Sequence, residues 1–189
     1  EATLELLKKM KIMMDNSTNG VNQIVDILNN FRNYMKKDEG ELNYIELPKV
    51  IDSSIEIASN FLKGIEIVKK FEETPKINVN RSKFIQVLTN LLVNAAQAID
   101  NHGIIKIHTY CDNKNVYVKI IDNGKGISED NLKHIFEPFF TTKKENGTGL
   151  GLYISREIIK EFGGQLKMNS EIQNGTEVTI NLPIVEELP

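Results

Sequence analysis

The sequence predicts an α+β fold of two layers, in which a mixed sheet is covered by helices on one face and a long coiled-coil-like helix comes first. Three observations lead to this prediction. Helical and strand patterns are intermixed from residue 43 onward, two pairs of strands are joined by short polar turns, and a narrow apolar stripe runs through residues 1–36. Stacking such elements in layers is the stable way to bury their apolar faces.

Residues 1–36 are predicted to form one helix. Their apolar positions alternate at intervals of three and four, which is a heptad pattern over about four repeats. This seam consists of Leu7, Met10, Met14, Ser17, Val21, Ile24, Leu28, Phe31 and Met35. So narrow a stripe favours packing in a bundle or a homodimer, and packing on the core of its own domain is the alternative. The charged residues 37–42 are the predicted linker to a domain over residues 43–189.

The first part of that domain mixes short strands with two helices. Residues 44–47 are a strand candidate, and Pro48 then favours a helix that ends near residue 63, before Gly64. Residues 66–71 and 76–79 alternate as strands do.

The next helix, predicted over residues 81–99, has two unlike faces. Its apolar face is formed by Phe84, Val87, Leu88, Leu91, Leu92, Ala95 and Ile99. A row of side-chain amides lies on another face, at Gln86, Asn90, Asn94 and Gln97. Asn is a poor helix former, and amides among apolar residues cost free energy unless a polar group satisfies them. The row is therefore either a solvated face or a binding surface.

Two hairpins and two helices complete the predicted domain. The strands are residues 104–111, 116–121, 165–170 and 177–182, joined in pairs by the polar turns 112–115 and 173–175. A short helix begins near Ser128, where Glu129 and Asp130 suit a positive N-terminus. Another helix runs from about residue 150 to 162 and ends at Gly163.

Charge and cysteine content narrow the possible functions. A net charge of −3 and a pI near 5.7, without a basic stripe, argue against nucleic acid as a partner. Cys111 is the single cysteine, so no intramolecular disulfide can form, which suits a reducing compartment. No apolar run reaches the roughly 18 residues of a membrane helix. We expect a cytoplasmic protein whose sensor or membrane parts lie outside this chain.

Three loop segments carry chemistry. Residues 122–127 (DNGKGI) follow a strand, where a carboxylate can accept a hydrogen bond from an exocyclic amine, although most such sequences are simple turns. Residues 147–152 (GTGLGL) open a helix, and glycines there expose backbone N–H groups to an anion. Residues 135–144 lie between them and offer aromatic anchors beside Thr141, Thr142 and Lys143, or form an ordinary surface loop.

Together and in this order, these segments resemble the ATP-binding catalytic domain of sensor histidine kinases, a branch of the GHKL superfamily with the Bergerat fold. Residues 90–95 are similar to its N box, 122–126 to its G1 box, 136–140 to its F box and 147–151 to its G2 box. Gly175 and Thr176 are similar to a pair that lies beside the adenine. Residues 1–36 resemble the second helix of the dimerisation and phosphotransfer hairpin.

The resemblance implies a site for ATP and Mg²⁺. Asn94 would be the metal ligand, Asn90 and Gln97 would contact phosphate or metal-bound water, and Asp122 would accept from adenine N6. Lys143 and the glycine loop would close over the phosphates, so that Asn90, Asn94 and Lys143 are the catalytic residues. The expected nucleotide contacts are Asn90, Asn94, Gln97, Asp122, Gly124, Gly126, Ile127, Thr142, Lys143, Gly147, Thr148, Gly149, Leu150, Gly151, Leu152 and Thr176.

The implied activity is transfer of the γ-phosphoryl group to a histidine. Hydrolysing members of the superfamily carry a glutamate four residues before the metal ligand, whereas this chain has Asn90, a poor base. This favours transfer to a supplied nucleophile over fast hydrolysis. His102, His108 and His134 all lie in the predicted catalytic domain, in a turn, a strand and the short helix. None suits the acceptor, which would lie on a helix absent from this chain.

The expected partners are that phosphoacceptor helix, the receiver domain of a response regulator and a second copy of the chain. Two other functions remain open. The chain could be a non-catalytic nucleotide-binding and dimerisation module, or a GHKL ATPase or serine kinase of the anti-sigma type. The heptad helix argues against the anti-sigma type, which needs no histidine-bearing bundle.

Overall fold

A computed structural model of the chain describes residues 41–143 and 147–185, together with residues 5, 9–11, 13, 14, 17, 18 and 20. The predicted seam between residues 7 and 35 and the linker over residues 37–42 therefore lie largely outside the described residues. The N-terminal coiled-coil-like helix, and the dimer through it, stay predictions.

The domain is built on one mixed sheet of five strands. In spatial order the strands are β2 (Ile65–Phe71), β4 (Gly103–Cys111), β5 (Asn115–Asp122), β7 (Gly175–Pro183) and β6 (Gln165–Glu171). Strands β2 and β4 are parallel, and every other neighbouring pair is antiparallel. The two predicted hairpins, β4–β5 and β6–β7, are both confirmed, and so is the mixed character of the sheet.

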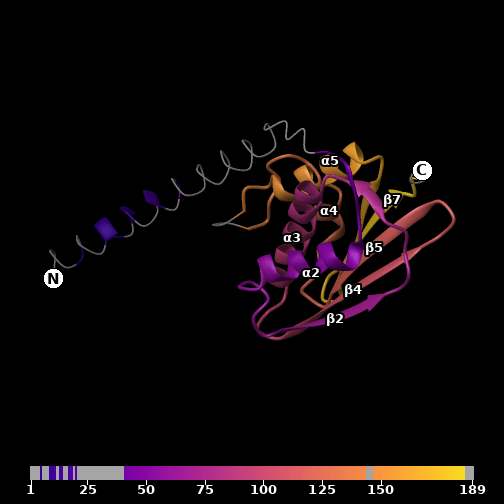
Figure 1. Cartoon of the computed structure of the whole chain (residues 1–189). Helices are drawn as coiled ribbons and strands as arrows, with labels where there is room; N and C mark the ends of the chain where they lie inside the picture. The colour runs from indigo at the N-terminus through magenta and orange to yellow at the C-terminus, as the bar shows by residue number, and fades with distance from the viewer. Residues whose placement is uncertain are drawn as a thin grey trace.

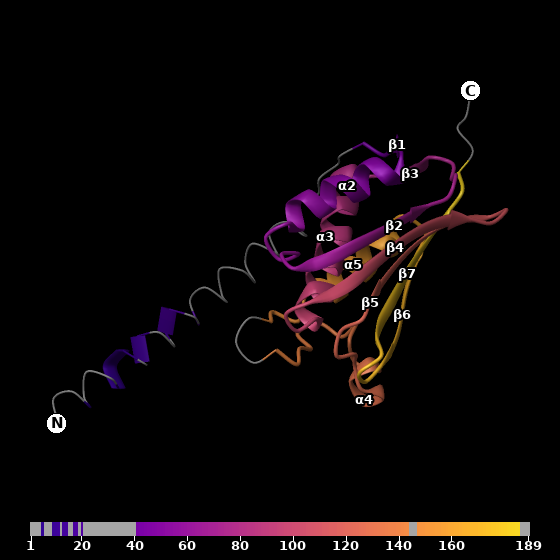
Figure 2. The same cartoon turned by 90° about the horizontal axis from the view of Figure 1, so that it is seen from below.

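The helices cover one face of this sheet. Helices α2 (Leu47–Ala58), α3 (Arg81–Ala98) and α5 (Gly151–Glu161) lie on the same side, as Figures 1 and 2 show. A short helix, α4 (Glu129–Leu132), follows β5, and β1 (Asn43–Ile45) pairs with β3 (Ile77–Val79) in a small antiparallel sheet. The predicted two-layer α+β class is confirmed for this domain. None of the helices in the described ranges has the length and apolar character that a bilayer span requires.

The core forms where α3 meets the sheet. Phe84, Leu88 and Leu91 on α3 are at most 2% exposed, and Ile105 and Ile107 on β4 belong to the same core cluster with at most 1% exposure. The apolar residues spaced by three and four thus form one buried face of the helix, and the alternating apolar residues form one buried face of the strand. The side of α3 that carries the amide row is consequently turned away from this core.

Two predicted boundaries near the start of the domain are wrong. Leu47, predicted to end a strand, is the first residue of α2, because extended Glu46 is its N-cap and Pro48 suits its first turn. The same helix ends at Ala58 rather than near residue 63. Beyond it, successive short hydrogen bonds such as Phe61 N–H to Ala58 O (2.8 Å) form tight turns instead.

One close backbone contact brings β7 beside the end of β5. Gly175 has φ +82°, and a Cβ there would lie 1.9 Å from the carbonyl oxygen of Asp122. Only glycine permits this approach. It sets the register in which Asp122 faces Thr176. The strand therefore begins at Gly175, earlier than the predicted residue 177.

We expect Leu88→Ala to lower the free energy of unfolding by about 2–5 kcal/mol, because it leaves a cavity beneath α3. Urea denaturation measures this change. The matched control is Ile57→Ala on α2, where the side chain is 58% exposed and the expected change is about 0.5 kcal/mol or less. Equal losses in the two variants would contradict the assignment of α3 to the centre of the core.

Candidate functional site

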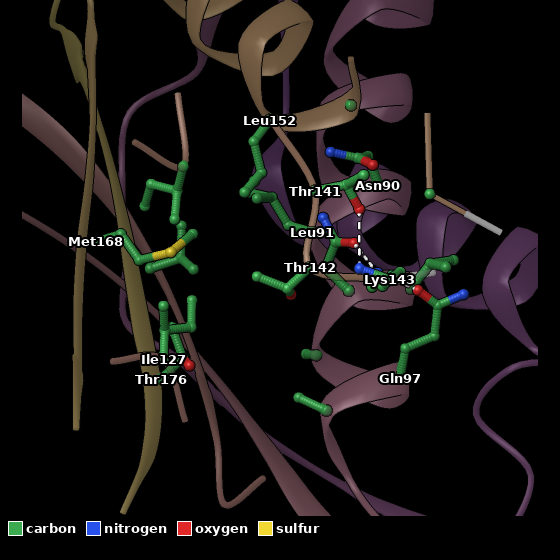
Figure 3. A pocket seen from close by; sticks show the side chains of 18 of the residues that line it. Asn90, Leu91, Gln97, Ile127, Thr141, Thr142, Lys143, Leu152, Met168 and Thr176 are labelled. Carbon is green, nitrogen blue, oxygen red and sulfur yellow. Dashed lines mark hydrogen bonds between the residues drawn. The ribbon is translucent and has the colours of Figure 1, made fainter. Parts of the chain in front are cut away.

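A large cavity lies between the amide-bearing side of α3, the start of α5 and the inner face of β6 and β7. Its volume is about 750 Å³, within the range of small-molecule sites. Figure 3 shows its two walls, with Ile127, Met168 and Thr176 on the sheet side facing Leu91 and Leu152 across the space. The predicted site residues that line it are Asn90, Asn94, Gln97, Asp122, Gly126, Ile127, Thr142, Lys143, Gly147, Thr148, Gly149, Gly151, Leu152 and Thr176.

Two predicted contacts do not line the cavity. Gly124 lies against the end of α3, where a Cβ would be 2.5 Å from Ala98 O, and its N–H donates to Asp122 Oδ1 at 2.8 Å. Leu150 is 6% exposed and belongs to the core at the start of α5. Both residues pack beneath the cavity lining and support residues that form it.

Asp122 occupies one end of the cavity. It is 5% exposed, at the last position of β5. The backbone N–H groups of Gly124 and Thr176 donate to its carboxylate, but burial outweighs them and raises the pKa of Asp122. A buried carboxylate that keeps acceptor capacity suits a ligand that donates a hydrogen bond, such as a ring with an exocyclic amine.

Ser170 on β6 holds the backbone around this end. Its hydroxyl accepts from Ile127 N–H at 2.9 Å and donates to the carbonyl of Gly175 at 2.8 Å. It also lies 2.9 Å from the hydroxyl of Thr176. One half-buried hydroxyl therefore connects the loop after β5 to the first residues of β7.

The amide row lies at the other end. Lys143 Nζ donates to Asn94 Oδ1 at 3.0 Å and also to Gln97 Oε1. These two amide oxygens are therefore directed at a positive charge. Lys143 is exposed as a whole residue, yet the loss of hydration at its ammonium group lowers its pKa, and the nearby charge of Lys125 lowers it further.

Asn90 is held against the start of α5. Its Nδ2 donates to the hydroxyl of Ser155 at 3.0 Å, and Ser155 is 2% exposed. A Cβ on Gly151 would lie 2.5 Å from Asn90 Oδ1, so the amide packs directly on the helix backbone. This contact fixes α3 and the N-terminal turn of α5 relative to each other.

The glycine loop before α5 packs on the segment that precedes it. Gly149 has φ +67°, and a Cβ there would lie 2.3 Å from the backbone of Phe139. Phe139 N–H donates to Gly149 O at 3.0 Å, while Phe139 itself has φ +68°. Residues 147–150 are thus positioned at the N-terminus of α5, where backbone N–H groups and the helix dipole attract anions.

Several lining residues were not among the predicted site residues. Met168, Ile172 and Val178 complete the apolar wall, Ser155 orients Asn90, and Lys125 adds a second cation. The lysine stands inside the predicted DNGKGI segment and could have been found there. The strand residues gave no comparable signal, because alternation predicts which face they share but not which ligand they meet.

Comparisons with known proteins agree with this geometry. The family described as histidine kinase-, DNA gyrase B-, and HSP90-like ATPase matches residues 79–186. The sensor histidine kinase ZraS of Escherichia coli (strain K12) is 36% identical over 146 residues, which cover 76% of this chain and 31% of that protein. This chain thus spans about a third of the length of that curated relative.

Two solved structures share the architecture over most of the chain. Full-length ShkA in complex with AMPPNP has a TM-score of 0.74 and 25% identity, covering 88% of this chain and 36% of that one. Histidine kinase ThkA in complex with response regulator protein TrrA has a TM-score of 0.73 and 28% identity, with coverages of 88% and 48%.

Burial of Asp122 predicts a pH-dependent effect on stability. A raised pKa in the folded state means that its contribution to stability is complete below the ordinary aspartate pKa of about 3.9 and is lost as the pH rises through the raised value. Asp122→Asn should therefore raise the melting temperature near pH 7.5 and change it little near pH 4. Thermal denaturation across this range measures the effect.

Asp112→Asn is the matched control. Hydrogen bonds from Lys114 N–H, the Tyr117 hydroxyl and Asn115 N–H lower the pKa of Asp112, so its contribution is present at neutral pH and is lost as the pH falls through the lowered value. This variant should be less stable than the natural protein at pH 7.5. If Asp122→Asn also lost stability there, burial would not be the dominant influence on Asp122.

Proposed function

Since the chain belongs to the family of histidine kinase-, DNA gyrase B- and HSP90-like ATPases, we propose that it is the catalytic part of a two-component sensor histidine kinase. It binds Mg²⁺ and ATP and transfers the γ-phosphoryl group to a histidine on a helix outside this chain. The observation that carries the proposal is the cavity itself, which has a buried carboxylate at one end and a row of amides with a lysine at the other.

The base end of the cavity suits adenine. Its apolar walls, Leu91 and Leu152 opposite Met168 and Ile127, can enclose a planar ring. Asp122 then accepts from the exocyclic amine, a donor that guanine lacks at the equivalent ring position. The complex of ShkA with AMPPNP, an ATP analogue, supports a nucleotide in this fold.

The residues at the other end fit a magnesium ion. The metal prefers oxygen ligands, and Asn94 Oδ1 and Gln97 Oε1 are already directed at a cation in the form of Lys143. Asn94 would hold the metal directly, while Asn90 and Gln97 would meet its water ligands or phosphate. When bound, the metal supplies positive charge that neutralises the phosphate oxygens.

The chain contributes positioning and electrostatics rather than a base. Asp122 is the only carboxylate among the described residues that line the cavity, and it lies at the base end. Asn90 donates to Ser155 and cannot take a proton from water. Lys143, Thr142 and the backbone N–H groups at the start of α5 stabilise negative charge on the transferred group. The acceptor histidine must therefore supply the nucleophile.

The wider role follows from the same assignment. The phosphorylated histidine would be the donor for the receiver domain of a response regulator, as the complex of ThkA with TrrA supports for a similar protein. The chain would work as a homodimer through residues 1–36, on the cytoplasmic side, with any membrane anchor in other parts of the protein.

The proposal is tested by phosphorylating, in trans, a separate hairpin that carries the acceptor helix. With labelled ATP and Mg²⁺, the natural chain should give acid-labile, base-stable label on that hairpin. Asn94→Ala should lower the rate by about two orders of magnitude or more, because the metal loses its protein ligand. Asp122→Asn should bring the affinities for ATP and GTP closer together in calorimetry.

Asn169→Ala, on an exposed position of β6, is the control and should leave the rate unchanged. Binding of ATP without transfer to the hairpin would favour the non-catalytic module. Fast release of phosphate without any hairpin would favour a GHKL ATPase. If calorimetry detected no binding at millimolar ATP, the assignment would fail altogether.

We also expect the chain alone not to label itself on histidine. His108 Nε2 lies 2.8 Å from Glu72 Oε1 on the sheet, and His134 Nδ1 lies 2.9 Å from Glu137 Oε1. His134 follows α4 in a turn, so its predicted place in the short helix is wrong. Neither histidine lines the cavity, and neither does His102. Stoichiometric self-labelling at any of the three, detected by mass spectrometry, would show that the acceptor is misassigned.

A further inference from the structure

The loop after β5 brings one charged side chain to the cavity, that of Lys125, beside the uncharged Ile127 and Ser128. Asn123 turns toward the sheet, where its Oδ1 accepts from Ile104 N–H at 2.8 Å. Gly124 and Gly126 have no side chains and lie against other backbone, with a Cβ 2.5 Å from Ala98 O and 1.9 Å from Glu171 O respectively. Lys125, between these glycines, lines the cavity.

The backbone of Lys125 is fixed from two sides. Its N–H donates to the carbonyl of Ala98 at 2.8 Å, at the end of α3. Its own carbonyl accepts from Gln173 N–H at 2.9 Å, in the turn between β6 and β7. The point from which this side chain extends is therefore as well defined as the helices and strands around it, although the side chain itself is exposed.

The charge of Lys125 is not neutralised by any carboxylate among the described residues. Among the described residues no carboxylate forms an ion pair with it, whereas Lys119 pairs with Glu177 and Lys83 with Glu161. Lys125 and Lys143 are the two cations that line the cavity in the described ranges, against the single carboxylate of Asp122. Two unpaired cations at one cavity favour an anionic ligand.

The two lysines also indicate where along the cavity Lys125 acts. Lys125 is three residues after Asp122, at the base end. Its charge nevertheless contributes to lowering the pKa of Lys143, which contacts Asn94 and Gln97 at the other end. The backbone of Lys125 is held near Asp122, and Lys143 lies beside Asn94 and Gln97, so we expect the ammonium group of Lys125 to act between the site of the base and the site of the metal. In a bound nucleotide this is the region of the α- and β-phosphates.

We propose that Lys125 is a nucleotide-binding residue that contacts the α- and β-phosphate groups, in addition to the residues that bind the base, the metal and the γ-phosphate. This inference rests on the proposed function. It makes a specific claim, namely that Lys125 contributes to affinity in proportion to the phosphate charge of the ligand and contributes nothing to recognition of the base.

The test compares adenosine, AMP, ADP and ATP, each with Mg²⁺, by isothermal calorimetry. Lys125→Met should weaken binding of ADP and ATP by about fivefold, at the upper end of what one solvent-exposed ion pair contributes. Adenosine should bind within about twofold of the natural protein, since it carries no phosphate. Lys125→Glu should cause a larger loss for ADP and ATP, and Lys125→Arg should restore most of the affinity.

Lys106→Met is the matched control. Lys106 is an exposed lysine on β4, outside the cavity, and its loss changes net charge equally. It should leave all four affinities unchanged. Melting temperatures without nucleotide should be equal for the natural protein, Lys125→Met and Lys106→Met, which excludes a folding defect.

The outcomes separate this inference from the proposed function. If the natural protein binds ATP and Lys125→Met binds ADP and ATP equally well, the role of Lys125 is overturned while the function stands. Equal weakening of adenosine and ATP would also overturn it, because Lys125 would then support the base or the fold. If the natural protein binds none of the four ligands, the proposed function itself fails.

Discussion

Helix α3 has two faces that must be satisfied at the same time, and the arrangement of the domain depends on how this is done. Its apolar side is buried against the sheet, with Phe84 at 0% and Leu88 at 1% exposure. Because a helix is rigid, burying that side fixes the direction of every other side chain on it. Asn90, Asn94 and Gln97 consequently line a cavity, where their amides form hydrogen bonds with Ser155 and Lys143.

The sheet contributes a second constraint, which is close approach of backbone at the end of β5. Glycines at 124, 126 and 175 allow α3, β6 and β7 to contact the loop that follows Asp122. This packing buries the carboxylate and raises its pKa, a cost to stability at neutral pH. A site that recognises a neutral hydrogen-bond donor needs an acceptor that is kept away from water. The same burial that would favour selective binding therefore lowers the stability of the folded protein when Asp122 is ionised.

Much of this arrangement could be predicted from the sequence. The spacing of Leu88 and Leu91 predicted α3, and the alternation around Ile105 and Ile107 predicted β4, because each pattern has the period of its element. The boundaries of α2 could not be predicted in the same way. Its start is set by the extended N-cap Glu46 before Pro48, and its end by tight turns after Ala58, and the periodicity of apolar residues reports neither feature. Fourteen of the sixteen residues that were expected to contact nucleotide line the cavity.

The sheet-side wall was less accessible to such reasoning. Met168 lies on β6, and its direction depends on the register between β6 and β7, in which it is opposite Val178. The pairing of Asn90 with Ser155 joins two helices 65 positions apart in the chain. Residue patterns within one element cannot report contacts of this kind, because they arise only after the elements have packed.

The same geometry suggests why, under the proposed function, phosphoryl transfer would require the acceptor helix to bind first. A hydrolase places a base beside the terminal phosphate, whereas the described lining of this cavity has its one carboxylate at the opposite end. Asn90 occupies the sequence position at which such a base is expected, four residues before Asn94, and Ser155 holds it against the start of α5. Charge stabilisation and alignment are thus provided in advance, but none of the described residues that line the cavity is placed to activate water near the amide row. In the proposed reaction the nucleophile is carried by another helix, so the docking of that helix would be the step at which a signal acts.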